Sequence, residues 1–122
     1  MKYVRVYADQ HGDSHFEDVK VEMSLTNFAP PAPPVELSPL MPVTQVAFLG
    51  FSAGWDGPPH PVPRRQFLFI LTGEIEGAVS DGKVQHLGPG SVVLLEDTWG
   101  KGHTARVVGN DPVLVAVVQL PD

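Results

Sequence analysis

The side chains best suited to chemistry in this sequence gather between Gly54 and Gly73, a segment that contains His60 and Gln66. An imidazole can exchange a proton near neutral pH or bind a metal ion, and an amide can both donate and accept hydrogen bonds. In an extended chain His60, Gln66 and Leu68 have the same parity, so a regular strand would point them to one face. We therefore expect this segment to line a pocket in which polar groups stand in an apolar wall.

Composition excludes several other kinds of site. The chain contains no cysteine, so it can form no disulfide, thiolate zinc site or thiol nucleophile. It also lacks a Ser-His-Asp order, a phosphate-binding glycine loop and a helical pair of metal ligands. A net charge of −6 with scattered Lys and Arg argues against nucleic acid and anionic membranes, and no apolar run reaches the length of a membrane span. The sequence therefore predicts a cytoplasmic protein that acts on a small molecule.

The elements that must position the pocket are short β-strands. At 122 residues one domain is expected, and no segment has the helical period of 3.6. Apolar residues alternate over 1–7 and 16–25, whereas 66–72 is almost wholly apolar, as in a strand covered on both faces. Glycine-containing turns separate the remaining segments. Strands are predicted over residues 1–7, 16–25, 42–51, 66–72, 74–79, 83–87, 91–95, 103–108 and 113–120.

An apolar, proline-rich arm is expected between Asn27 and Pro42, which contains six of the thirteen prolines. Proline removes backbone donors and keeps its neighbours extended, so this segment predicts an ordered arm packed on the barrel or on a second subunit. Tyr3 and Tyr7 lie on one face of the first predicted strand and add apolar surface. We expect these regions to form a homodimer, because a closed two-fold contact covers an exposed strand edge once and then stops.

The spacing of the central segment resembles the first motif of the cupin superfamily. Five residues separate Gly54 from His60, three separate Val62 from Gln66, and six separate Gln66 from Gly73. A second, weaker match starts at Gly90, with Glu96 at a proline position and His103 two residues late. The resemblance implies an all-β fold, an antiparallel cupin β-barrel or jelly roll with little helix. The N-terminal strands and arm would then occupy residues 1–42 and the barrel residues 43–120 of a single domain, 1–122.

The resemblance also implies a set of four metal-ligand positions, and this chain fills only part of it. His60 and His103 stand at two positions, while Val62 and Gln66 replace a histidine and a glutamate. Valine has no lone pair and an amide oxygen carries no charge, so we expect weak binding, if any, of a divalent transition metal such as Zn, Fe, Mn or Ni. His60, Gln66 and His103 are the candidate catalytic and metal-binding residues. The alternative is that they only fill the barrel interior with hydrogen-bonded polar groups.

Further contacts to a ligand are expected from Arg64, Trp55, Trp99 and Glu96. An arginine could clamp a carboxylate or phosphate, or pair with surface carboxylates instead. The tryptophans could stack on a planar ligand at the barrel mouth, or simply pack. Two functions stay open: an enzyme that uses a metal or histidine acid–base chemistry for oxygenation, isomerisation or a lyase-type reaction, and a binding or sensing protein without catalysis.

Overall fold

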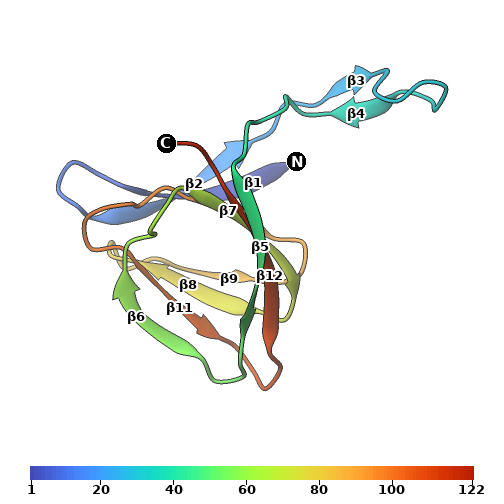
Figure 1. Cartoon of the computed structure of the whole chain (residues 1–122). Helices are drawn as coiled ribbons and strands as arrows, with labels where there is room; N and C mark the ends of the chain where they lie inside the picture. Colours follow the sequence, from blue (N-terminus) through green and yellow to red (C-terminus); the bar gives the residue numbers. More distant parts are fainter.

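Twelve β-strands and no helix make up the fold in the computed structural model, which describes residues 1–122 (Figure 1). The all-β expectation is confirmed, and no helix is present that could cross a membrane. The strands are β1 Lys2–Ala8, β2 Ser14–Lys20, β3 Ser24–Thr26, β4 Val35–Leu37, β5 Gln45–Phe51, β6 Asp56–His60, β7 Gln66–Thr72, β8 Ile75–Val79, β9 Val84–Leu87, β10 Val92–Leu95, β11 His103–Val107 and β12 Val113–Gln119.

Two sheets face each other and form the barrel. The larger has the strand order β2-β1-β10-β7-β12-β5, and the smaller has the order β6-β11-β8-β9. Neighbouring strands are antiparallel except β1 and β10, which run parallel with Val4 opposite Val93. Strands β5 and β6 end their sheets on the same side, and Figure 1 shows the two ribbons diverging there. No ladder joins β5 to β6, so the two sheets are separate along this side.

The main core lies between the sheets and follows the period-two pattern of the strands. In β12, Val113, Val115 and Val117 are buried in this core, while Leu114 between them is exposed. A smaller cluster covers part of the opposite side of the large sheet, where Phe67 packs edge-on against Tyr3 at a centroid distance of 5.3 Å.

The prediction that 66–72 is covered on both faces holds only for the first part of that strand. Phe67 is 5% exposed, whereas Leu71 is 43% exposed because the small outer cluster does not extend that far.

Strand β6, which reads Asp-Gly-Pro-Pro-His, was not predicted from the sequence, and neither were the short strands β3 and β4 as separate elements. Proline cannot donate to a β-ladder, so this composition argues against a central strand. The structure places β6 at the edge of the small sheet, where it pairs only with β11. An edge strand needs donors on one side only, and this explains how two prolines are tolerated in it.

The first strand does not offer the free surface that was expected of it. β1 lies inside the large sheet between β2 and β10, and Val6 is 2% exposed. Tyr3 packs on Phe67 of the same chain, and the Tyr7 ring lies 5.4 Å from that of His15. These contacts use the tyrosines within the chain, so the expectation that β1 supplies a dimer edge is corrected: the unpaired edges of the large sheet belong to β2 and β5.

The proline-rich arm projects away from the barrel instead of packing on it (Figure 1). Its two short strands, β3 and β4, pair with each other as a hairpin, and Leu25, Phe28 and Leu40 are 71%, 59% and 78% exposed. The two strands of the hairpin pair only with each other, and prolines keep its connections extended. The expected packing of the arm on its own barrel is therefore wrong, and packing on a second subunit stays a prediction.

Candidate functional site

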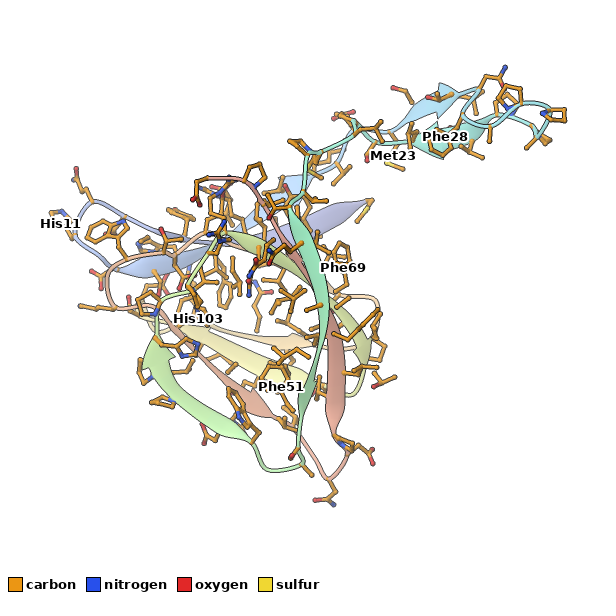
Figure 2. The ribbon with its side chains drawn as sticks, viewed as in Figure 1. His11, Met23, Phe28, Phe51, Phe69 and His103 are labelled. Atoms are coloured by element: carbon orange, nitrogen blue, oxygen red, sulfur yellow. The ribbon has the colours of Figure 1, made fainter.

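A cavity of about 430 Å³ opens between the two sheets. Fourteen of its twenty-one lining residues are hydrophobic, and no Asp, Glu, Lys or Arg lines it. The polar side chains in the wall are His60, Gln66, His103 and Thr104. Figure 2 shows His103 and Phe51, both in this lining, at the inner side of the barrel and far from the arm that carries Met23 and Phe28. The three candidate site residues thus share one cavity.

His103 begins β11 and is held by a buried carboxylate. Its Nδ1 lies 2.6 Å from Oδ2 of Asp97, whose side chain is 0% exposed. A carboxylate accepts hydrogen bonds, so in the neutral imidazole Nδ1 carries the proton and Nε2 keeps its lone pair. Asp97 is itself anchored, because its backbone oxygen accepts a hydrogen bond from Val62 N–H at 3.0 Å. The carboxylate therefore fixes both the orientation and the tautomer of the imidazole.

His60 ends β6 and lies opposite His103 in the β6–β11 ladder. Its Nδ1 is 2.8 Å from the carbonyl oxygen of Pro58. A carbonyl oxygen can only accept, so this Nδ1 also donates and Nε2 is again the free nitrogen. The two imidazole rings are 5.0 Å apart at an interplanar angle of 54°. Two imidazoles with matching tautomers therefore stand side by side in a mostly apolar wall.

The loop before His103 explains why this histidine comes two residues later than the resemblance predicts. Gly102 has a φ of +74°, and a Cβ there would overlap the backbone of His60 and the nitrogen of Pro61. Its carbonyl oxygen accepts a hydrogen bond from the buried Ser14 hydroxyl at 2.6 Å. Lys101 N–H reaches the carbonyl oxygen of Gly12 at 2.9 Å. The extra residues thus contact the β1–β2 loop. They also bring the backbone of Gly102 into direct contact with the backbone of His60, next to both histidines.

Three further predicted residues lie where the cavity can use them. Gln66 and Leu68 line it from β7, and Trp55 lines it from the loop before β6. The Trp55 ring lies 4.6 Å from the Phe51 ring at an interplanar angle of 59°. Val62, at a ligand position of the family motif, is 2% exposed and belongs to the core. The first-motif positions therefore do converge on the cavity, with a valine among them.

Arg64, Glu96 and Trp99 lie outside the cavity, which corrects their expected role as ligand contacts. Glu96 accepts hydrogen bonds from Arg5 Nε at 2.5 Å and Arg65 Nε at 2.7 Å. Burial opposes its ionisation, but together these hydrogen bonds outweigh it and lower the pKa of Glu96. Trp99 is 52% exposed and lies against the β1–β2 loop, and Arg64 is exposed in the turn before β7.

Asp97 is the functional candidate that sequence reasoning missed. Val93 and Leu95 of β10 point into the cavity, and Asp97 continues their parity beyond the end of the strand. Glu96 instead continues the parity of Leu94, which packs on the outer side. Extending the period-two pattern by two residues would have assigned the inward carboxylate to Asp97 and the outward one to Glu96.

The donor set does not fit a tightly held metal ion. No group of three or more His, Cys, Asp or Glu side chains is arranged to hold one. His60 and His103 offer two imidazole nitrogens and Gln66 one neutral oxygen, while Val62 offers no lone pair. A divalent ion would gain no neutralising carboxylate from the cavity wall, and tetrahedral sites need more donors than these residues supply.

The comparisons with known proteins point to one fold. Neither a protein family model nor a curated protein sequence matches the chain. Among solved structures, an uncharacterized conserved protein with a double-stranded beta-helix domain from Klebsiella pneumoniae is similar with 26% identity and a TM-score of 0.51, over 62% of this chain and 65% of that one. The DMSP lyase DddQ from Ruegeria pomeroyi has 26% identity and a TM-score of 0.52, over 63% of this chain and 38% of that one.

A third similarity extends over more of the chain. The cupin domain of Schizosaccharomyces pombe Cnp3 matches 89% of this chain and 73% of its own length with a TM-score of 0.54, and at 15% identity it speaks for the fold alone. The matched region spans less than two thirds of the Klebsiella and Ruegeria proteins. Together with the two-sheet barrel, these likenesses show that the chain has the double-stranded β-helix fold of the cupins.

Proposed function

We propose that this protein binds a small, largely apolar organic molecule between its sheets and that His103, held by Asp97, acts on it as a general acid or base. The hydrogen bond between the buried Asp97 carboxylate and His103 Nδ1 carries this proposal. It leaves Nε2 as the nitrogen that can take a proton from the ligand, with a carboxylate behind the ring to stabilise the imidazolium that forms.

The composition of the wall defines the class of ligand. A charged ligand would lose its hydration without finding an opposite charge, since no ionised Asp, Glu, Lys or Arg lines the cavity. An uncharged molecule with one polar end would bury its apolar part against the valines and leucines of the wall. Its polar end would hydrogen-bond to His60, Gln66 and His103. The cavity volume falls within the range of small-molecule pockets, roughly 300–1,000 Å³.

The reaction proposed is a proton transfer at the polar end of such a molecule. His103 Nε2 would take up a proton from the position next to a polarised group, while the Gln66 amide N–H donates a hydrogen bond to that group and His60 Nε2 accepts one from a hydroxyl or N–H of the same molecule. Elimination and isomerisation both begin with this step. The DMSP lyase among the similar structures supports an enzymatic use of the fold, although the similarity spans only 38% of that protein.

A second candidate function is binding without catalysis. No Ser, Cys, Lys or carboxylate lines the cavity, so acid–base chemistry depends on the two imidazoles alone. The same hydrogen-bonding groups would hold a ligand that is sensed or carried without being changed. Turnover separates the two functions, because both predict binding and only one predicts a product.

The test starts from a screen of uncharged small molecules by ligand-detected NMR, followed by turnover assays on the hits. Asp97→Asn keeps the volume of the side chain but can offer an N–H to His103 Nδ1, which would move the imidazole proton to Nε2. We expect ligand binding to persist and kcat to fall by roughly 10²–10⁴. Nitrogen-15 spectra of the imidazole should report the exchanged tautomer.

Asp111→Asn is the matched control, because Asp111 is exposed in the turn before β12. It should leave both the spectrum and kcat unchanged. Wild-type turnover in Asp97→Asn, with the tautomer shown to be altered, would contradict the acid–base role. Binding of hits with no product from any of them would favour the second candidate.

A further inference from the structure

We propose that Ser14 is a positioning residue for the acid–base chemistry of the cavity. Its buried hydroxyl fixes the peptide bond that leads into His103 and thereby the place of that imidazole beside His60. The inference rests on the proposed function, because it takes His103 as the group that exchanges the proton. Ser14 does not line the cavity, so it acts through the backbone of its neighbours.

The hydroxyl of Ser14, the first residue of β2, is held in one orientation. Ser14 is 0% exposed. Its Oγ donates to the carbonyl oxygen of Gly102 at 2.6 Å and accepts a hydrogen bond from the backbone N–H of Ser80 at 2.8 Å. A carbonyl oxygen can only accept and an N–H can only donate, so neither bond can be reversed. The hydroxyl proton therefore points at the Gly102 oxygen.

The Gly102 carbonyl belongs to the peptide bond that ends at the His103 nitrogen. A peptide unit is planar, so the direction of this carbonyl also fixes the direction in which the chain enters His103. On its other side, Gly102 lies against the backbone of His60 with no room for a Cβ. Ser14 thus fixes a residue that is bonded to one histidine and packed against the other.

Pairing between strands does not by itself settle the direction of His103. Strand β11 begins at this residue, and its pairing with β6 shifts register between His103 and Ala105. Irregularities of this kind bend a strand and re-aim its side chains. Asp97 holds the far end of the His103 side chain at Nδ1, so the backbone end needs a second fixed point. The hydrogen bond from Ser14 supplies that point.

The segment that carries Ser14 is itself held firmly. Asp9 Oδ1 accepts hydrogen bonds from the backbone N–H groups of His11 and Asp13 at 2.8 and 3.1 Å. Ser14 N–H donates to Ser80 Oγ at 2.7 Å, which ties the start of β2 to the turn after β8. A supporting residue positions a site only when its own conformation is fixed in this way.

A hydroxyl that only satisfied buried backbone groups would serve stability and nothing else. Ser14→Ala and Ser80→Ala separate the two roles, because each removes one hydroxyl and two hydrogen bonds. In Ser80→Ala the Ser14 hydroxyl keeps both of its partners, since Ser80 donates to it from the backbone. Ser80→Ala is therefore the matched control, which loosens the same loop but leaves the Gly102 bond in place.

The first experiment needs no substrate. Proton and nitrogen-15 NMR spectra of the full chain report nuclear Overhauser effects between the rings of His60 and His103. We expect these effects to be lost in Ser14→Ala and kept in Ser80→Ala. In the wild type the Ser14 hydroxyl proton should exchange slowly with solvent, because its hydrogen bond is buried. Rapid exchange of this proton would contradict the proposal.

The second experiment uses 5-nitrobenzisoxazole, a small uncharged molecule that breaks down once a base takes the proton from its ring carbon next to nitrogen. The C–H electron pair completes a nitrile, the N–O bond breaks, and its electrons leave on the oxygen of the 2-cyano-4-nitrophenolate product. His103→Gln defines the part of the rate that depends on His103. Ser14→Ala should lower kcat/KM for that part by roughly 10–100-fold, because a misplacement of about 1 Å can cost 10²-fold.

Two controls show that the loss is one of position. Affinity for 5-nitroindazole, which has the same shape but no N–O bond to break, should be unchanged in Ser14→Ala. Ser80→Ala should keep the wild-type rate. Circular dichroism checks that each variant keeps its strands, and if Ser14→Ala does not fold, Ser14→Cys takes its place, because a thiol fills the site but is a weak donor.

Failure of this inference and failure of the proposed function give different results. A rate that His103→Gln does not lower would contradict the proposed function, and the positioning role with it. A rate that falls in His103→Gln but not in Ser14→Ala would overturn the positioning role alone. Equal losses of rate in Ser14→Ala and Ser80→Ala would also overturn it, since the hydrogen bonds of the loop would then matter only for stability.

Discussion

Replacing Gly102 with alanine tests whether close backbone contact holds the two histidines in place. The φ of +74° at this position costs a residue with a Cβ roughly 1–2 kcal/mol. The new methyl group would also overlap backbone atoms of His60 and Pro61, which cannot move aside as a flexible side chain would. Overpacking of this kind costs roughly 1–3 kcal/mol. We therefore expect the free energy of unfolding to fall by about 2–5 kcal/mol.

The assay is urea denaturation, with Gly82→Ala as the matched control. Gly82 has a φ of +93°, but a Cβ there meets nothing within 4 Å. The control should therefore lose only the backbone part, about 1–2 kcal/mol. Gly102→Ala should also shift the imidazole signals of His60 and His103, whereas Gly82→Ala should not. Equal losses of stability in the two variants would refute the reasoning, since the steric part would then be absent.

Two further predictions concern pH and metal binding. Hydrogen bonds to Asp9, and to a smaller extent to Asp81, raise the pKa of His15 above its usual 6.5. Their contribution to the free energy of unfolding is therefore fully present below pH 6.5 and is lost as the pH rises through the raised pKa. Urea denaturation should therefore show His15→Gln destabilised most near pH 5–6 and less at pH 8–9, and a difference that does not vary with pH would contradict this. Val62→His combined with Gln66→Glu should raise Zn²⁺ affinity by at least about tenfold in calorimetry, because it adds an imidazole and a charge in the cavity wall. Unchanged affinity would show that the wall does not aim these positions at a common point.

The barrel strands and the cavity position could be predicted from the sequence because both depend on local periodicity. Strand 66–72 was predicted with the bounds of β7, and Gln66 and Leu68, which have the same parity within it, both line the cavity. His60 lies on β6 of the other sheet, so its place in the wall does not follow from that parity. Parity along a strand is fixed by backbone geometry, so it survives folding without change. His103, the first residue of β11, was predicted as a site residue from the family resemblance, although it comes two residues later than the second motif places it.

What escaped prediction depends on contacts between distant segments. Glu96 was expected at the pocket, but it accepts a hydrogen bond from Arg5, which is ninety-one residues away in the sequence. No local sequence pattern predicts a pairing over that separation. The contact between Gly102 and the His60 backbone is equally non-local. The arm forms a hairpin and does not pack on the barrel as expected. Apolar composition predicts that a segment will be buried, but it does not indicate which surface will bury it.

Strand β5 serves two surfaces at once, and this gives the fold a built-in thermodynamic linkage. Leu49 and Phe51 belong to the cavity wall, while Phe48, between them, points outward, and hydrogen bonds reach the strand from β12 alone. A ligand that changes the position of β5 from inside also changes the outer surface on which Phe48 lies. By reciprocity, any molecule that binds this outer surface would alter ligand affinity by the same factor.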